Sequence, residues 1–404
     1  MKNFWTLVRF ELKKILSRKI TWIAFGLVFM IMLAFGFYRA FASHEVDGVR
    51  VTAREEEMLA KAEEKKLAGR MIDDELLEEL FVARAAGTEV FAPYKNIYRN
   101  IMGDLCDSNT FSILEGARSV DEIKAATGIA GDEELIYALR KQRVEKSFEN
   151  QYLTEGEKEY WRGVLAKEDS VPWEYDYYQG VHFIWVAAYT AIVLIALMLA
   201  VSLANLFAEE HQKKTDQLVL CARNGRKVLC GAKIIAGLLF VMGSTGLVLL
   251  ATAVSQLITF GPDGWNAPIQ LIVPTSMVQM TFGEMILYTY AVAILASILY
   301  CSIILCCSEL FRNSTVAVMA VIVILVLVPM MVLVPYEYRV LSQIFDLNPI
   351  NVIAIWSATD FRLVPFFGTY LTVYQVAPVL YTVLAAGFLW IGSRAYLKFQ
   401  VSGR

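Results

Sequence analysis

Long apolar stretches alternate with polar, charged segments along this chain. Crossing a bilayer as a helix takes about 20 consecutive apolar residues, and six stretches here reach that length with almost no charge. A soluble core helix is rarely so long and so uniformly apolar. The pattern predicts six membrane-spanning helices, at residues 20–38, 183–207, 233–259, 285–307, 315–335 and 377–397.

The composition supports this interpretation. Hydrophobic residues make up 57% of the 404 residues, charged residues 19%, and the mean hydropathy is +0.48. These values place the chain among integral membrane proteins. The first span is followed by Ala40-Phe41-Ala42, which imitates a signal-peptidase site, but the apolar run is long for a signal peptide and Arg39 interrupts it. We therefore expect this span to be retained.

The basic residues predict the orientation. Lys and Arg concentrate in four places that lie on one face if there are six spans, and cytoplasmic segments carry such an excess. We expect that face, with both termini, to be cytoplasmic in a bacterial cell membrane. These residues are Lys2, Arg9, Lys13, Lys14, Arg18 and Lys19; Lys213, Lys214, Arg223, Arg226, Lys227 and Lys233; Arg312; and Arg394, Lys398 and Arg404.

Residues 3–18 predict an amphipathic helix before the first span. Phe4, Trp5, Val8, Leu12, Ile15 and Leu16 recur at helical spacing, with basic residues on the other face. Such a helix lies in the cytoplasmic membrane interface, where it contacts lipid and could also touch a partner. Its candidate contact residues are Trp5, Arg9, Glu11 and Lys13.

The acidic segment 43–182 predicts a helical extracytoplasmic domain. Ala, Glu, Lys and Leu dominate it, and Gly residues mark the turns. The expected helices cover 52–68, 73–86, 93–106, 119–127, 132–150 and 154–167. Trp173, Tyr175, Tyr177, Tyr178 and Phe183 follow, and we expect them to form an aromatic belt at the outer membrane interface.

A second external segment, 336–376, is nearly neutral and amphipathic. It is interpreted as a partly membrane-embedded helix or re-entrant piece over the external mouth. Pro329 and Pro335 should kink the fifth span, which neighbouring helices in a membrane tolerate. The predicted domains are thus 1–19, the interfacial helix; 20–42, the first span; 43–182, the external domain; and 183–404, the remaining spans with a cytoplasmic loop at 208–232.

That loop and its flanks, 209–233, form the most informative feature of the chain. The run TDQLVLCA is helical in character, Asn224-Gly225 is a strong turn signal, and RKVLCGAK leads into the third span. A structured cytoplasmic loop between two spans suggests that something on that side binds it.

Several kinds of chemistry find no candidate residues. The six cysteines form no CxxC pair and none has a histidine at ligand spacing, so we expect no metal site. The spans hold polar residues such as Asn205, Ser244, Thr252 and Gln256 but almost no ionisable group, unlike ion-coupled carriers. No GxxxxGK[ST] phosphate loop occurs, so the energy for any transport must come from another chain. No cofactor and no nucleic-acid partner are expected, and the chain is predicted not to be an enzyme.

The loop resembles that of the type-2 ABC transporter permeases, the ABC-2 family. The family pattern of Glu, Gly-Thr, Leu, a turn with Arg, then Gly-x-Lys is matched by Glu210, Lys214-Thr215, Leu218, Arg226, Gly231 and Lys233, with Lys214 in place of the glycine. The opening FELKKILSRK is similar to the family's interfacial helix, and the large external insert resembles a subset of bacterial members.

The resemblance implies an all-α membrane protein, a coupling helix that seats in an ABC ATPase dimer, and a second permease copy or related chain. It implies ATPase-coupling roles for Glu209, Glu210, Thr215, Leu218, Leu220, Arg226 and Lys233. The leading hypothesis is therefore a permease that exports a peptide, lipid-like or drug-like compound. The alternative is a membrane-anchored sensory or immunity protein that binds a ligand through its external domain.

Overall fold

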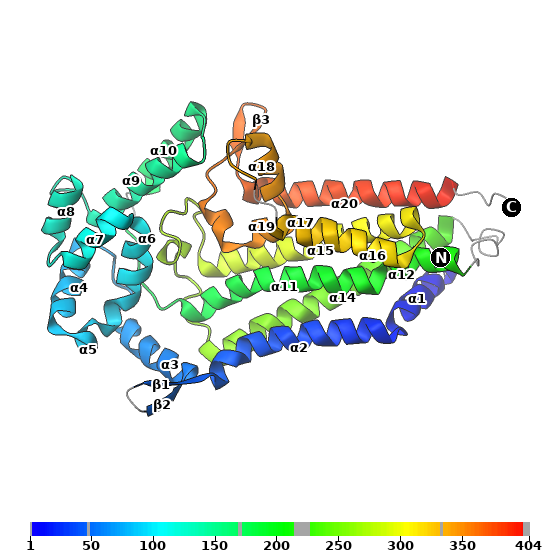
Figure 1. Ribbon diagram of the computed structural model, residues 1–404, viewed down its shortest axis with the longest axis horizontal. Coiled ribbons are helices and arrows are strands. Elements are labelled where there is room, and N and C mark those ends of the chain that lie inside the picture. The colour runs from blue at the N-terminus through cyan, green and yellow to red at the C-terminus, as the bar shows by residue number, and fades with distance from the viewer. Residues whose placement is uncertain (1, 47–48, 169–171, 214–226, 332–333, 399–404) are drawn as a thin grey trace.

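The computed structural model is elongated, with a bundle of long helices at one end and a large domain of short helices at the other (Figure 1). It describes residues 2–46, 49–168, 172–213, 227–331 and 334–398. The amino-terminal helix and the last turn of the carboxyl-terminal helix lie at the same end of the bundle, opposite the large domain.

The bundle consists of long apolar helices that run side by side. Within the described residues, five are long and apolar enough to cross a membrane. Helices α11 and α15 are the most buried of them, whereas α2 and α20 lie at the edges. The bundle helices are α2 (Lys19–Phe41), α11 (Gln179–Leu203), α12 (Asn205–Gln212), α14 (Lys227–Phe260), α15 (Phe282–Phe311) and α20 (Val373–Lys398).

The predicted fifth span differs from the others. Its described apolar helix, Ser314–Met330, is shorter than the five long ones. It runs through α16 (Ser314–Ile322), the π-helical segment η5 (Val323–Leu327) and α17 (Val328–Met331). Pro329 lacks the N–H that would bond to Leu325, and a π-helical turn just before a proline relieves the clash of its ring with that carbonyl. The sequence predicts that Pro329 and Pro335 kink this span; the structure has a π-helical segment before Pro329, and Pro335 lies beyond the described helix.

Helix α1 (Lys2–Leu16) precedes α2 and packs against α14 and α2. The expected amphipathic helix is present, but its buried face differs from the predicted one. Val8 and Ile15 are buried with Glu11 between them, whereas Trp5 and Leu16 are exposed. Positions 8, 11 and 15 share one face of a helix, so burying the two aliphatic residues also buries the acid.

The large domain, between α2 and α11, is helical as predicted. Side-chain caps define several helix starts: Thr52 and Glu55 form a capping box, and Asp73, Asp107 and Ser119 each accept from a backbone N–H. The first elements are a hairpin of β1 (Ser43–Val46) and β2 (Val49–Thr52), α3 (Ala53–Glu64) and η1 (Lys65–Leu67). The rest are α4 (Asp74–Ala86), α5 (Thr88–Phe91), η2 (Ala92–Tyr94), η3 (Ile97–Met102), α6 (Gly103–Leu105), α7 (Ser108–Gly116), α8 (Val120–Thr127), α9 (Leu135–Asn150) and α10 (Glu155–Glu168).

The aromatic segment before α11 corrects one prediction. Trp173, Tyr175, Tyr177 and Tyr178 are buried between the large domain and the bundle, so they do not form a lipid-facing belt. Their polar atoms bind protein groups: Tyr175 donates to Glu64 (2.9 Å), and Tyr178 donates to the Leu271 carbonyl (3.1 Å). Phe183 lies in the first turn of α11 and contacts Phe260 at a centroid distance of 5.5 Å. This junction joins the two parts of the molecule into one packed unit.

The segment between α17 and α20 holds short elements packed on the large domain. They are α18 (Arg339–Asp346), α19 (Pro349–Ile353), η6 (Ile355–Thr359) and a hairpin of β3 (Val364–Phe366) and β4 (Thr369–Leu371), while η4 (Ile269–Leu271) lies in the loop between α14 and α15. Val364 pairs with Leu371 and Phe366 with Thr369. Gln151 binds Phe361 N (2.8 Å) and the Thr359 carbonyl (2.8 Å), which fixes the segment to α9.

Candidate coupling site

Three elements from two distant parts of the sequence meet at the bundle end opposite the large domain. They are α1, α12 and the first turns of α14, which contribute Glu11, Glu210 and Lys233. Lys233 lies between the two carboxylates, with its Nζ 2.8 Å from Glu210 Oε1 and 3.8 Å from Glu11 Oε2. Lys233 and Glu11 are each 1% exposed. The site is therefore a buried ionic network that spans three helices.

Lys14 completes the network and balances its charge. Its Nζ lies 2.7 Å from Glu11 Oε1 and 3.8 Å from Glu210 Oε1. Two ammonium groups thus face two carboxylates. Lys233 also donates to the Leu206 carbonyl (2.6 Å) and lies 5.1 Å from the centre of the Phe207 ring. Further hydrogen bonds of this kind offset the cost of burying the charge of Lys233. Glu11 Oε2 is buried without a hydrogen bond, and Lys233 Nζ, 3.8 Å away, compensates its charge only through the ionic attraction.

Glu209 links α12 to the turn between α1 and α2. It accepts from Arg18 and from Lys213, whose Nζ lies 2.6 Å from Glu209 Oε1. Glu209 and Glu210 therefore point to different cations, one at the surface and one inside. The cavity between them has a volume of about 340 Å³ and is lined by Lys14, Ser17, Arg18, Leu206, Glu209, Glu210, Lys213 and Lys233.

Two further contacts fix α12 to the end of α15. His211 Nε2 lies 3.1 Å from Glu309 Oε2, and both side chains are buried. Ser308 Oγ accepts from the backbone N–H of Phe207 (3.2 Å) and of Ala208 (3.0 Å), and it donates to the Ala204 carbonyl (2.6 Å). Helix α11 ends at Leu203 and α12 begins at Asn205, with Ala204 between them. The Ser308 hydroxyl therefore binds backbone groups that a continuous helix would pair with one another.

The structure places the predicted site residues in three groups. Glu11, Glu209, Glu210 and Lys233 come together in the site. Trp5, Arg9 and Lys13 lie on the exposed side of α1 and away from the network. Thr215, Leu218, Leu220 and Arg226 lie outside the described residues, as does Lys214. The basic end of the loop, from Lys227 on, forms the first turns of α14 and extends the predicted third span backward.

Sequence reasoning missed Lys14 as a network member, and it missed Ser308, Glu309 and His211. The sequence places Lys14 on the basic face of the helix, opposite the apolar residues. Ser308 and Glu309 follow the predicted fourth span directly, and an acid at a span end is a signal that could have been used.

Comparison with protein families decides the identity of the chain. The model of a family described as ABC-2 family transporter protein matches residues 5–385. The chain belongs to the ABC-2 family. Neither a search of curated proteins nor a search of solved structures gave a match.

Membership of the ABC-2 family establishes a multi-pass membrane protein and a transporter component. ABC-2 membrane domains lack ATPase motifs, and in this family the ATPase is a separate subunit. The sequence agrees, since it contains no phosphate loop.

Proposed function

We propose that this ABC-2 chain is the membrane subunit of an ATP-driven exporter, and that the ATPase docks on the 209–233 loop and on α1. The observation that carries the proposal is the position of Lys233, bound to Glu210 on one side and close to Glu11 on the other. Any force on the loop acts through these contacts on α1, α12 and α14 together.

The loop has short, well-anchored ends. Helix α12 ends at Gln212 and α14 begins at Lys227, so the loop joins two helices that both belong to the network. Glu209 and Glu210 lie in the last turn of α12, next to the start of the loop, and both are ion-paired. Closure of an ATPase dimer against the loop would therefore displace α12 and α14 as a unit. This provides a path from ATP hydrolysis to the bundle.

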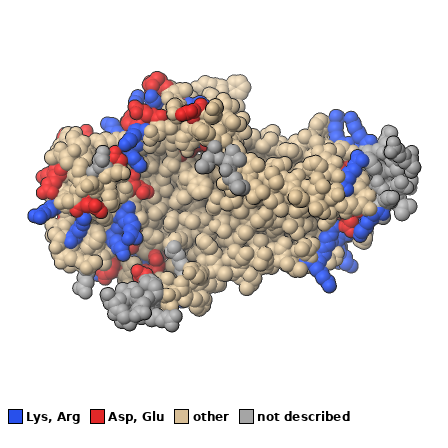
Figure 2. Space-filling view, viewed as in Figure 1, with Lys and Arg blue, Asp and Glu red and all other residues tan. Residues whose placement is uncertain are grey.

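The charge distribution supports a cytoplasmic location for this end. Figure 2 shows Lys and Arg gathered at the bundle end with few acidic residues, a broad belt without charge, and a large domain where both signs mix. Cytoplasmic flanks of membrane helices carry such an excess of Lys and Arg. Both termini are then cytoplasmic, and the large domain lies outside the cell membrane.

The cargo we propose is a peptide, a lipid-like or a drug-like compound. The spans offer hydroxyl and amide groups such as Ser244, Thr252 and Gln256, and among the residues that the structure describes no charged side chain is buried in mid-span to bind an ion. A pathway of this kind suits apolar or amphipathic molecules. A second copy or a related permease chain would supply the other half of the pathway.

Co-purification with an ABC ATPase and ATP-dependent efflux from proteoliposomes test the proposal. Changing both Leu218 and Leu220 to Asp places two charges in the loop and replaces no member of the buried network, and we expect it to abolish efflux and ATPase binding. Glu210→Lys should abolish efflux while membrane insertion persists, because a third cation then faces Lys233 and Lys14. Glu63→Lys, on an exposed pair of the large domain, is the matched control.

Normal ATP-dependent efflux from the Leu218 and Leu220 variant would contradict the assignment of this loop. If no ATPase binds the wild-type chain, the sensory or immunity alternative is favoured.

A further inference from the structure

Helix α18 has its polar side turned inward and its apolar side turned outward. Val340, Leu341 and Ile344 are 70%, 57% and 63% exposed. Ser342, on the opposite side, is 1% exposed. A surface helix of a soluble domain shows the reverse arrangement, with its apolar stripe against the core. The outer side of α18 is therefore built for an apolar neighbour.

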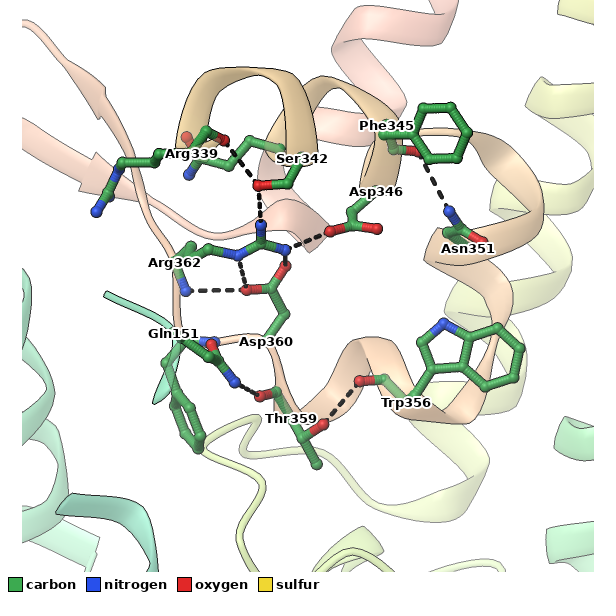
Figure 3. Close-up of polar contacts among 12 residues, drawn as sticks. Gln151, Arg339, Ser342, Phe345, Asp346, Asn351, Trp356, Thr359, Asp360 and Arg362 are labelled. Atoms are coloured by element: carbon green, nitrogen blue, oxygen red, sulfur yellow. Dashed lines mark hydrogen bonds and ion pairs between the residues drawn. The ribbon is translucent and has the colours of Figure 1, made fainter. Parts of the chain in front are cut away.

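A network around Arg362 holds the polar side of α18 in place (Figure 3). Arg362 donates to Ser342 Oγ (2.7 Å) and to Asp360 Oδ2 (2.8 Å), and it is paired with Asp346. Arg339, at the start of α18, is paired with Glu157 of α10. Both charged residues of the helix are thus drawn inward, which leaves its outer side without charge.

The tip of the β3–β4 hairpin is also apolar and exposed. Phe366 and Phe367 are 53% and 94% exposed, and their rings meet edge to face at 4.8 Å. Phe367 has φ +45° and Gly368 has φ +84°, so both turn residues are in the left-handed region. A bulky residue is rare there and costs conformational energy. The turn therefore keeps a fully exposed phenylalanine at a position where Asn or Asp would be less strained.

The location of these two elements indicates their neighbour. They lie between the ends of two apolar helices, since α17 ends at Met331 and α20 begins at Val373. Figure 1 shows α18 and the hairpin projecting sideways from the bundle, beside the start of α20. Tyr336 and Tyr338, just before α18, are 42% and 63% exposed, and tyrosines are enriched at membrane interfaces.

We propose that α18 and the hairpin tip insert into the lipid interface of the outer leaflet. The apolar side of α18 and the two phenylalanines would lie at the boundary between headgroups and acyl chains, where interfacial helices bury their apolar faces. Helix α20, which begins just after the hairpin, also exposes apolar side chains: Val379 and Val383 are 65% and 63% exposed. The proposal rests on the membrane placement of the chain and not on export.

A lipid surface fits these observations better than a protein partner. A stable protein interface takes about 20–30 residues from each side, whereas this patch consists of α18, two preceding tyrosines and a hairpin tip. The outer side of α18 presents no charge, because Arg339, Asp346 and Arg362 are all paired on the inner side. The exposed Glu337, between the two tyrosines, accepts a hydrogen bond from Tyr152 OH (3.2 Å) and is the charged group beside the patch. Protein partners are selected by charge and shape, and a lipid interface requires neither.

Fluorescence quenching by lipids tests the proposal on the full-length chain in lipid nanodiscs. A polarity-sensitive probe is attached at Val340→Cys or Phe367→Cys, and the quencher is a phospholipid spin-labelled near the headgroup end of its acyl chain. The matched control is Val82→Cys on α4, because Val82 is a valine of similar exposure, 66%, on the large domain. The described native cysteines are buried or half-buried, and Cys221→Ser is included in every variant.

We expect quenching at positions 340 and 367 to exceed that at position 82 several-fold. Quenching at 340 and 367 equal to that at 82 would overturn the proposal. So would disulfide cross-linking of Val340→Cys between two chains with no quenching, since a second copy would then cover the patch. The result does not depend on any ATPase, so failure of the export proposal leaves it unaffected.

Discussion

Two buried glutamates, one at each end of the bundle, differ in what neutralises them. Glu11 is 1% exposed and has an ammonium group 2.7 Å away on Lys14 and another 3.8 Å away on Lys233. Glu64, at the junction with the large domain, is 3% exposed, and its direct partners are neutral: Asn96 Nδ2 at 2.6 Å and Tyr175 OH at 2.9 Å. The same side chain is thus charge-paired at one end and only hydrogen-bonded at the other.

The consequence appears in the pKa of Glu64. Burial raises it from 4.5 to about 7, and the hydrogen bonds from Tyr175 and Asn96 offset only part of the effect. Glu57 raises the pKa further, and Lys95 lowers it. The comparison teaches that burial alone does not decide how a carboxylate behaves. The candidate coupling site joins helices through charge, whereas the junction between the bundle and the large domain is sensitive to pH.

Removing the central cation should give the largest effect. Lys233→Met leaves the buried Glu11 and the partly buried Glu210 beside Lys14 alone, and breaking a buried network in this way costs about 3–5 kcal/mol. We expect a markedly lower melting temperature of the purified protein in detergent. The variant Lys233→Met with Glu11→Gln and Glu210→Gln removes the uncompensated charges and should recover much of that stability.

This pair of variants separates charge pairing from packing. A single Lys233→Met variant as stable as the wild type would show that the network contributes little. Equal loss in the single and triple variants would assign the effect to the aliphatic stem of Lys233.

The second effect is a pH dependence of the stability, caused by Glu64 at the junction between the bundle and the large domain. The folded-state pKa of Glu64 exceeds the unfolded value, so the cost of its buried charge is absent below about pH 4.5 and complete above about pH 7. Stability should therefore fall as the pH rises through this window, by about 3 kcal/mol in total. Thermal unfolding measured between pH 5 and 8 follows most of the change.

Glu64→Gln supplies the control, because an amide of the same shape carries no charge at any pH. We expect it to gain stability over the wild type as the pH rises. Parallel pH profiles for the two proteins would mean that another group titrates in this range.

The smallest effect on the melting temperature should come from the exposed ion pair of the candidate coupling site. Lys213 is 66% exposed and pairs with Glu209, which Arg18 also binds. Exposed ion pairs contribute about 0–1 kcal/mol, so Lys213→Ala should leave the melting temperature nearly unchanged. A loss of stability comparable to that of Lys233→Met would show that Lys213 and Lys233 act as one unit.

The long helices could be predicted from the sequence because their signal is local. Apolar runs located the bundle, and alternating Gly and Glu-rich stretches located the helices of the large domain. The β1–β2 hairpin was missed although Asp47-Gly48 is a strong hairpin signal, because the flanking strands are only four residues each. Helix α7 was missed because its sequence, SNTFSILEG, has weak helix formers and depends on the Asp107 cap.

The partners within the site could not be predicted in this way. Glu209, Glu210 and Lys233 were found through the family pattern, and Glu11 was named as a candidate of the interfacial helix. Nothing in the sequence indicates that Glu11 faces Lys233, since their separation in the chain carries no distance information. The aromatic segment 173–178 was misplaced for the same reason: a tyrosine beside a span predicts a membrane interface, and only the packing of α3 against it reveals Glu64 as a partner.

The hydroxyl of Ser308 has a mechanical consequence. It takes hydrogen bonds from Phe207 and Ala208 and gives one to Ala204, at the point where α11 gives way to α12. A helix whose own ladder is interrupted bends more easily at that point than elsewhere. If an ATPase docks on the 209–233 loop as proposed, a displacement of the loop would therefore tilt α12 about Ala204, and α15 would hold that point in place through Ser308.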